Sequence, residues 1–485
     1  MSALGATLYV DLRHASCSDA RAKADVKSGL PLCTVQRAAQ LVDPGDLVLV
    51  GDGVYEDADN DKSVLRLTRG GSAGAPVTFR ALHRHRAQLK GTLPSGSTDF
   101  NWCVLLAPRV QWVVIDGFDI SGCATGVMIN NDNHQVVVSG NRIHEIGRRV
   151  TTTQYGQDGV SIGGGSTDVT VDGNVIHTIG RLAGSQYPNN HDHAVYIRGS
   201  RILVTNNAFY DLKAGWGVHI YGPDPKRELK IVNNTFAEAN PGRDGHIIVT
   251  TGTSDLLIQN NIFYQPRGGA VQIDTCSDVS KVSLLNNLTD RNQLTVGASC
   301  PFTLSGNLTG KTPLFAGPAQ HDYHLTAGSP GLDQGLRQGA PDHDLDGAAR
   351  PAGTAVDVGA FEFGAPLAGD GRAASDSGRG SDGRLDGAAS RDAGPADANA
   401  NPVDGGVGLD PRAGEGGATP EAGPGGDASV PGAAGCGCEV GWPFDGSYAR
   451  WLLLASGWLA LELRRRRRQK HRSSQNTGIG PSAPA

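Results

Sequence analysis

The feature that most constrains this chain is a short apolar segment that recurs between residues 110 and 315. It appears as VVIDGFDI, VVVSGNRIHEIG, VTVDGNVIHTIG, LVTNNAFYDLK, IVNNTFAEAN, IQNNIFYQP and LLNNLTDRN. One position in each copy anchors the alignment and advances by 23, 33, 33, 27, 27 and 26 residues along Phe118, Asn141, Asn174, Asn207, Asn234, Asn261 and Asn287. Repeats of this length, with β-branched residues and Asn or Gly at the corners, predict a β-solenoid in which each repeat is one rung.

A second, shorter strand follows each anchoring position: TGVMIN, DGVSIG, HAVYIR, WGVHIY, HIIVTT and GAVQID. Because side chains alternate along a strand, one row points inward: Val127/Ile129, Val160/Ile162, Val195/Ile197, Val218/Ile220 and Val271/Ile273. The anchoring Asn side chains are expected to stack as a buried ladder at one corner, which gives them a structural role.

The ends of this region also follow a pattern. A YVD strand precedes TVQRAAQLVDPGDLVLVGDGVYED, in which Val35, Ala38, Ala39 and Val42 predict a short capping helix, and HDYHLTAGSPGLDQG follows the repeats. Together these segments resemble the right-handed parallel β-helix superfamily that includes the pectate-lyase-like proteins. The resemblance implies an all-β domain over 1–363, with the cap at about 7–55, rungs at about 60–315 and a closing segment at 316–363.

The rest of the chain has a different composition. Residues 364–435 are nearly all Gly, Ala, Asp, Ser, Pro and Arg, which predicts a disordered linker. Cys436 and Cys438 then precede an apolar run, Trp451–Leu461, and five arginines, Arg464–Arg468. The run is shorter than the roughly 20 residues of a spanning helix. The order Cys, apolar run, Arg cluster resembles the C-terminal sorting tail of myxobacterial surface proteins. It implies an anchor over 436–468 and a polar tail over 469–485; the alternative is a weakly hydrophobic tail that touches anionic lipid.

Six further cysteines lie in the large domain, none with zinc-ligand spacing. Their separations suggest three local disulfides, Cys17–Cys33, Cys103–Cys123 and Cys276–Cys300, formed in an oxidising compartment. MSALGATLYV is no signal peptide, so we expect the natural start to lie upstream. The sequence thus predicts an exported protein held at the cell envelope by its tail.

The candidate functional face is the outward side of the second strands. Ionisable and aromatic residues gather there on the central rungs, and the turns before these strands carry insertions at 148–157 and 181–192. Insertions in solenoids tend to gather on the functional face. Such side chains suit an acidic polysaccharide through stacking and charge-assisted hydrogen bonds. The alternative is that these side chains belong to an ordinary solvated sheet face with no binding role. The predicted binding residues are Tyr221, Trp216, Asp158, Ser161, His193, Asp244, Arg148 and Tyr187.

Two reactions compete if the protein is an enzyme. β-Elimination from a uronic acid needs a cation, a base and an acid, for which Arg198, His219 (or Lys213) and Tyr196 are candidates. Hydrolysis needs two carboxyl groups roughly 5–9.5 Å apart, for which Asp158 and Asp192 are the candidates. A third hypothesis is a surface protein that binds glycan or only projects from the cell. The expected partners are a polysaccharide and the cell envelope, without nucleic acid, and the chain is expected to be a monomer.

The one cofactor hypothesis concerns calcium. Asp342, Asp344 and Asp346 alternate before Gly347, as in the first half of a calcium-binding loop. The acidic residue expected at the twelfth position is absent, since Gly353 stands there. The alternative is an Asp-rich turn that closes the last rung.

Overall fold

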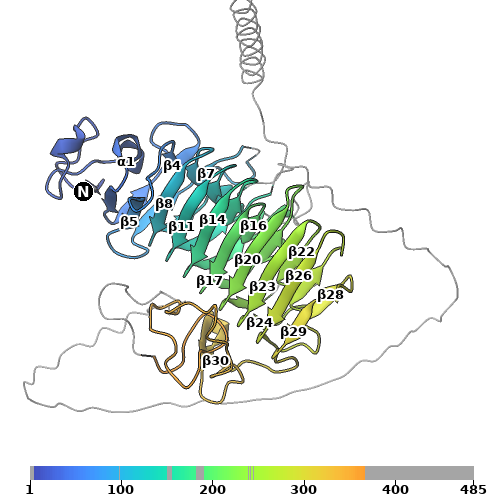
Figure 1. Cartoon of the computed structure of the whole chain (residues 1–485). Helices are drawn as coiled ribbons and strands as arrows, with labels where there is room; N and C mark the ends of the chain where they lie inside the picture. The colour runs from blue at the N-terminus through green and yellow to red at the C-terminus, as the bar shows by residue number, and fades with distance from the viewer. Residues whose placement is uncertain are drawn as a thin grey trace, which may run out of the picture.

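The computed structural model of this 485-residue chain describes residues 5–97, 99–149, 156–181, 191–238, 240, 242–243 and 245–365. These residues form a right-handed parallel β-helix, as predicted. Three parallel sheets, here called A, B and C, run along its axis (Figure 1). Each complete rung passes from sheet B to sheet A and then to sheet C, so the turn from C back to B begins the next rung.

The strands of each sheet follow one another in chain order. Sheet A contains β1 (Thr7–Val10), β2 (Leu47–Val50), β5 (Val77–Ala81), β8 (Gln111–Asp116), β11 (His134–Ser139), β14 (Thr167–Asp172), β17 (Ser200–Thr205), β20 (Lys226–Val232), β23 (Thr253–Gln259), β26 (Ser280–Leu285) and β29 (Thr303–Ser305). Sheet B contains β4 (Ser63–Leu67), β7 (Trp102–Leu106), β10 (Thr125–Ile129), β13 (Val160–Ile162), β16 (Val195–Ile197), β19 (Val218–Ile220), β22 (Ile247–Val249), β25 (Val271–Ile273) and β28 (Thr295–Gly297). Sheet C contains β3 (Gly53–Tyr55), β6 (Ala87–Lys90), β9 (Asp119–Ser121), β12 (Arg142–Ile146), β15 (Val175–Ile179), β18 (Ala208–Tyr210), β21 (Thr235–Ala237), β24 (Ile262–Tyr264) and β27 (Leu288–Thr289).

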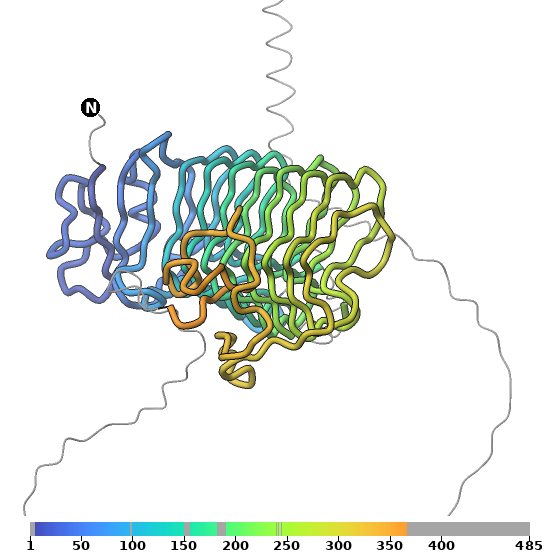
Figure 2. The backbone as a smooth tube through the Cα atoms, turned by 60° about the horizontal axis from the view of Figure 1, so that its bottom comes forward, coloured from blue at the N-terminus to red at the C-terminus, as the bar shows by residue number. Residues whose placement is uncertain are grey.

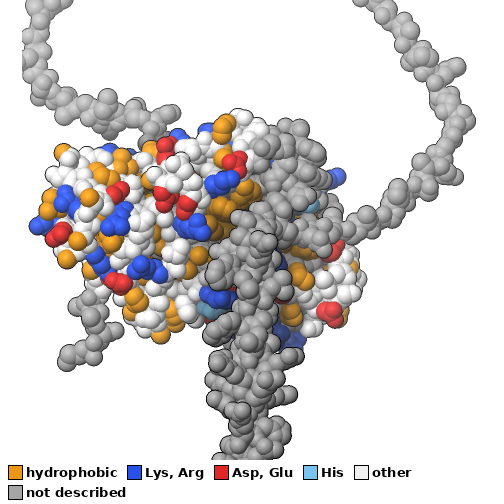
Figure 3. Space-filling model, turned by 90° about the horizontal axis from the view of Figure 1, so that it is seen from above, with side chains coloured by type: hydrophobic (Ala, Val, Ile, Leu, Met, Phe, Trp, Pro, Cys, Tyr) orange, Lys and Arg blue, Asp and Glu red, His pale blue; other side chains and the backbone are white. Residues whose placement is uncertain are grey.

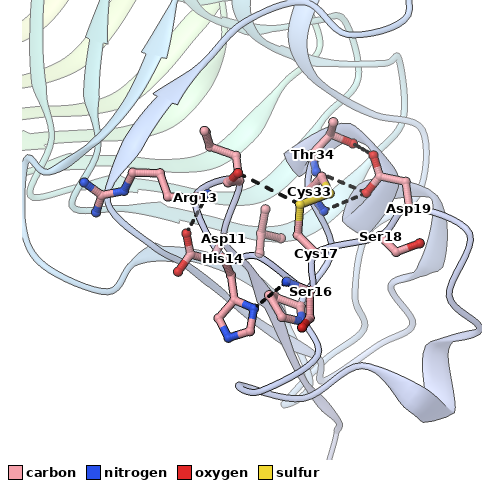
Figure 4. The surroundings of a disulfide bond; sticks show 12 residues. Asp11, Arg13, His14, Ser16, Cys17, Ser18, Asp19, Cys33 and Thr34 are labelled. Atoms are coloured by element: carbon pink, nitrogen blue, oxygen red, sulfur yellow. Dashed lines mark hydrogen bonds between the residues drawn. A yellow bond between two sulfur atoms is a disulfide. The ribbon is translucent and has the colours of Figure 1, made fainter.

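The N-terminal cap contains the predicted helix, α1 (Val35–Leu41). The side chain of Thr34 caps it by accepting a hydrogen bond from the backbone N–H of Arg37 at 3.1 Å. The carboxylate of Asp19 accepts the backbone N–H groups of Cys33 and Thr34, beside the Cys17–Cys33 disulfide (Figure 4). The apolar face of α1 is buried in the core, as the sequence pattern predicted.

All three predicted disulfides are confirmed. Cys17–Cys33 belongs to the cap, and Cys103–Cys123 joins neighbouring rungs. Cys276–Cys300 joins the turn between β25 and β26 to the turn between β28 and β29. Their Cα–Cα distances are 5.0, 5.6 and 5.5 Å, within the range of ordinary disulfides.

The buried Asn ladder is confirmed as well. Asn207 Nδ2 donates to the carbonyls of Val171 and Thr205 and to Asn234 Oδ1, at 2.8–2.9 Å. Its own Oδ1 accepts from the backbone N–H and the side chain of Asn174. The amides therefore satisfy turn groups that the sheets leave unpaired.

The residue before each ladder Asn explains a change along the repeat. This position is left-handed, and early rungs fill it with glycine, as at Gly140 (φ 64°) and Gly173 (φ 63°). Later rungs use Asn, the residue that tolerates this conformation best after glycine. These are Asn206, Asn233, Asn260 and Asn286, with φ of 51–54°.

The closing segment does not cover the end of the solenoid. It folds back beside sheet C and includes the antiparallel strands β30 (Phe315–Gly317) and β31 (Asp322–Leu325) (Figures 1 and 2). Tyr323 and Phe361 pack against Tyr210 of sheet C in a second apolar cluster. Asn233 Nδ2 donates to the carbonyls of Asp357 and Gly359, so the left-handed Asn side chains help to dock the segment.

The Asp-rich turn for which the sequence suggests a calcium loop lies in this closing segment. Both oxygens of Asp344 accept backbone N–H groups, those of Ala348 and Glu362. Asp346 contacts His324 at 2.7 Å, whereas Asp342 contacts His343 at 2.8 Å. Among the described residues, the one group of three acidic or metal-ligating side chains that converges within 4.8 Å is Asp57, Asp59 and Asp61. The three carboxylates of the turn thus have separate protein partners.

The predicted linker, anchor and tail, with Cys436 and Cys438, lie outside the described residues. Within those residues, we find no helix with the length and hydropathy that crossing a membrane requires.

Candidate functional site

The two central strands of sheet B, β16 and β19, set the geometry of the candidate site. Their register pairs Val195 with Val218 and Tyr196 with His219. The Val pair is fully buried in the core, which confirms the predicted inward row. Tyr196 and His219 consequently stand together on the outward side, one rung apart.

Five aromatic rings gather around this pair, here called the ring cluster: His193, Tyr196, Trp216, His219 and Tyr221. The His193 ring stacks on Tyr196 at 5.6 Å between ring centroids and meets His219 edge-on at 4.2 Å. Trp216 and Tyr221 lie 5.1 and 5.3 Å from His219. The sequence therefore placed these five predicted residues correctly on one face.

A hydrogen-bonded chain orders the two imidazoles. The backbone N–H of Trp216 donates to His193 Nδ1 at 3.3 Å, and His193 Nε2 lies 2.7 Å from His219 Nδ1. A neutral imidazole has one N–H and one acceptor nitrogen. His193 therefore donates from Nε2, and the proton of His219 sits on its remaining nitrogen, Nε2. His219 is thus set up as a hydrogen-bond donor.

Burial keeps both imidazoles neutral. His193 and His219 are 2% and 4% exposed. Burial, with a smaller contribution from nearby cations, lowers the pKa of His219 to about 3 and holds the pKa of His193 well below its usual range. The outward side of sheet B is therefore packed here, unlike an ordinary solvated sheet face.

Two guanidinium groups border the ring cluster. Arg243 lies over the Trp216 ring, 4.3 Å from its centroid. Arg198 follows β16, and its side chain is 16% exposed, with only a 3.8 Å contact to the carboxylate of Asp224. Arg198 Nε and Trp216 Nε1 are buried and have no hydrogen-bond partner in the described part of the chain.

Asp158 and Ser161 lie at the neighbouring rung. Asp158 accepts the backbone N–H of His193 and bonds to Ser161; burial raises its pKa well above the usual value. Asp192 is fully buried and binds the side chain of Arg181 at 2.5 Å. Asp192, the second carboxylate of the pair predicted for hydrolysis, is therefore a buried group with an Arg partner.

The structure separates two other predicted residues from the ring cluster. Arg148 and Lys213 line an open groove of about 620 Å³ where sheet C turns toward sheet B. We call it the turn groove; its lining residues are Ser95, Glu145, Arg148, Arg149, Thr178, Asp211 and Lys213. Lys213 Nζ lies 2.5 Å from Asp211 Oδ1 and forms an ion pair with it.

Two predicted binding residues, Tyr187 and Asp244, lie outside the described residues, as do most of the two insertions.

The sequence interpretation missed a second aromatic column. His144, His177 and Tyr210 occupy equivalent positions of β12, β15 and β18, with stacked rings 5.0 and 4.7 Å apart. His321 of the closing segment continues the stack on Tyr210 at 4.4 Å. The recurring IHEI, IHTI and FYD segments contained this signal.

Lys226 was also missed. It begins β20, is fully buried, and donates to the carbonyls of Gly222 and Asp224 at 2.7 and 2.8 Å. Burial lowers its pKa to about 8, and neighbouring Arg198 contributes to the same shift. A single Lys at a strand start gives no sequence signal of burial.

The space-filling view from above shows Lys and Arg side chains interspersed with Asp and Glu on the visible described surface (Figure 3). That view displays no extended surface of one charge sign.

Comparisons with known proteins concern the fold. Residues 182–317 match the family model described as right handed beta helix region. No curated protein matches the chain. Similar solved structures include an alginate lyase from Paenibacillus sp. str. FPU-7, with 18% identity, 63% of this chain and 96% of that chain covered, and a TM-score of 0.46.

Two further structures illustrate the range of similar proteins. Pectate lyase Pel9A has 13% identity, covers 74% of this chain and 96% of its own, and has a TM-score of 0.40. PfbA, a surface adhesin of Streptococcus pneumoniae, has 12% identity, covers 59% of this chain and 68% of its own, and has a TM-score of 0.38. These values carry no conclusion about activity. The family match and the strand topology agree that the protein contains a right-handed parallel β-helix.

Proposed function

We propose that the outward side of sheet B binds an extended acidic polysaccharide. The carrying observation is the ring cluster together with two buried donors, Arg198 Nε and Trp216 Nε1, that lack partners among the described residues. Buried donors in native proteins are almost always paired. The exposed part of the Arg198 guanidinium can meet hydroxyl or carboxylate oxygens of a saccharide, and the aromatic rings beside it suit sugar rings.

Arg198 supplies the preference for an acidic ligand. Its guanidinium is partly exposed, and Asp224, the carboxylate that it contacts among the described residues, is 52% exposed and 3.8 Å away. A ligand carboxylate can accept two parallel hydrogen bonds from a guanidinium, which is stronger than this long contact. His219 adds a donor of fixed orientation through its bond to His193.

β-Elimination is the second candidate function. It is favoured by the neutral state of His219 beside Tyr196 and Arg198, because a base must be unprotonated at working pH. In this reaction a base removes the C5 proton, the electron pair forms the C4–C5 double bond, and the leaving oxygen takes a proton. The orientation of His219 as a donor favours binding over this role.

The proposed location is extracellular. Three disulfides fit an oxidising compartment. Attachment to the cell envelope through residues 436–468 remains part of the proposal, as does a monomeric state.

Binding of the full chain to a glycan array tests the proposed function. We expect acidic glycans to bind, and Arg198→Ala to weaken them at least about tenfold, as for loss of a charged hydrogen bond. His219→Ala tests elimination, because it should lower turnover more than it lowers binding. Turnover is measured by the absorbance of unsaturated uronide products. Saccharide binding without such products leaves a binding protein, and binding unaffected by Arg198→Ala places the site elsewhere.

A further inference from the structure

The turn groove is built from equivalent positions of successive rungs. Glu145, Thr178 and Asp211 are aligned by the register of β12, β15 and β18, and all three have left-handed backbones, with φ of 53, 53 and 50°. Neighbouring rungs are about 4.8 Å apart. The groove therefore presents one side chain per rung along the solenoid axis, in a spacing close to that of sugar units in an extended chain.

Charge in the groove is unevenly paired. Asp211 binds Lys213 at 2.5 Å and accepts the hydroxyl of Thr178 at 2.9 Å. On the middle rung, Arg181 is withdrawn into its buried pair with Asp192. These contacts neutralise the cations of two rungs.

Arg148 and Arg149 are different, because their side chains bond only to backbone carbonyls in the described part of the chain. Arg148 Nη1 donates to the carbonyls of Gly180 and Arg181 at 2.8 and 2.9 Å. Arg149 Nη1 donates to the carbonyl of Leu93 at 3.0 Å. Each guanidinium keeps further N–H groups for an acceptor, since it has five donors.

The same contacts hold both groups in position. The carbonyl of Arg149 accepts the backbone N–H of Ser97 at 2.9 Å, so the loop carrying Ser95 is tied to the turn from both sides. Arg148 lies across the next turn through its two carbonyl contacts. A ligand would therefore meet fixed donors and lose little binding energy to ordering them.

We propose that the turn groove is a second saccharide site, in which Arg148 and Arg149 bind the carboxylate of a uronic acid unit. Thr178, Asp211 and Lys213 bind hydroxyl groups of the following units, so the chain lies parallel to the solenoid axis. Guanidinium groups suit carboxylates because their donors form a planar fork. The inference shares only its ligand class with the proposed function and needs none of the ring cluster.

Calorimetric titration of the full chain with tetragalacturonate, and with its methyl ester, tests this inference. Arg149→Ala should weaken tetragalacturonate at least about tenfold, as expected for loss of a charged hydrogen bond. Arg149→Lys should lose part of the affinity, because the charge remains but the fork does not. The methyl ester should bind wild type about as weakly as Arg149→Ala binds the acid. Arg227→Ala, an exposed cation on sheet A, is the matched control and should bind as wild type does.

Three results would overturn the inference: equal affinity of Arg149→Ala and wild type, equal binding of acid and ester, or no binding of tetragalacturonate by wild type. Arg198→Ala separates the two sites. If Arg198→Ala abolishes binding and Arg149→Ala does not, the turn groove is not a saccharide site and the proposed function stands. If only Arg149→Ala weakens binding, the groove stands and the ring cluster is not the site.

Discussion

Sheets B and C carry similar side chains on their outward sides, yet the structure uses them differently. On sheet C, His144, His177 and Tyr210 form a column that the closing segment continues with His321. On sheet B, the ring cluster is ordered by a bond between two imidazoles and bordered by Arg198, whose nearest carboxylate is 3.8 Å away. The sheet C column thus docks part of the chain itself, whereas sheet B keeps donors that the described chain does not satisfy.

The comparison shows that outward aromatic and imidazole residues do not by themselves mark a binding face. What separates the two sheets is the partner of each polar group. On the sheet C side, Tyr323 donates to Glu238 at 3.1 Å, and Arg350 binds Glu362 in a fully buried pair. On the sheet B side, Arg198 Nε and Trp216 Nε1 have no such partner among the described residues.

The largest expected effect comes from breaking the ion pair that holds the closing segment. Arg350→Met leaves Glu362 buried without its cation, which should cost about 3–5 kcal/mol. We expect the loss in the free energy of unfolding of the closing segment, with faster proteolysis within 315–365. Chemical denaturation and limited proteolysis measure both effects.

Saccharide binding by Arg350→Met sharpens this test. The variant should still bind an acidic glycan, since sheet B and the turn groove do not contact Arg350. Loss of binding together with unchanged proteolysis would show that the two sheets have been assigned the wrong roles.

The two sides should respond to pH with opposite signs. The pKa of His219 is lowered to about 3, so the unfolded chain takes up a proton below its ordinary 6.5 and the folded chain does not. Stability from this group is present above pH 6.5 and is lost as pH falls toward 3.

His324 behaves in the opposite way. Burial lowers its pKa, but contacts with Asp346 and Asp322 outweigh burial and hold the pKa above 6.5. Its stabilisation is therefore present below pH 6.5 and is lost as pH rises through the folded pKa. Melting temperatures of His219→Phe and His324→Gln across pH check this. His219→Phe should weaken the pH dependence of the melting temperature on the acid side, and His324→Gln should weaken it on the alkaline side. Equal slopes in both variants would contradict the assignment.

The smallest effect is expected on sheet A, which carries neither role. Arg201 pairs with Asp168 at 2.8 Å, but the Arg201 side chain is 46% exposed. Arg201→Ala should change the free energy of unfolding by less than about 1 kcal/mol, as for other surface ion pairs. Chemical denaturation measures it, and a loss as large as that of Arg350→Met would mean that burial does not decide these energies.

Much of the fold could be predicted because the repeat combines local signals. The Asn positions gave the ladder, the alternation of Val127 and Ile129 gave the inward row, and cysteine spacing gave the disulfides. The fold-back of the closing segment could not be predicted, because its contacts join residues such as Asn233 and Asp357 that are far apart in sequence.

The candidate site shows the same division. Strand alternation placed Tyr196 and His219 together, since register follows from the repeat. The partners of charged groups could not be predicted: Asp192 is taken by Arg181 and Lys213 by Asp211 only through turn geometry. Lys226, which the sequence interpretation missed, gains its interest from such contacts rather than from its position in the repeat.

Amide hydrogen exchange of the full chain with and without an acidic oligosaccharide tests the central comparison most directly. If sheet B and its preceding turns hold the ligand, protection should increase in peptides containing β16, β19 and residues 145–149. Exchange in the closing segment, 315–365, should stay unchanged. Protection confined to the closing segment and to the column of His144, His177 and Tyr210 would contradict the account, because it would place the saccharide on sheet C.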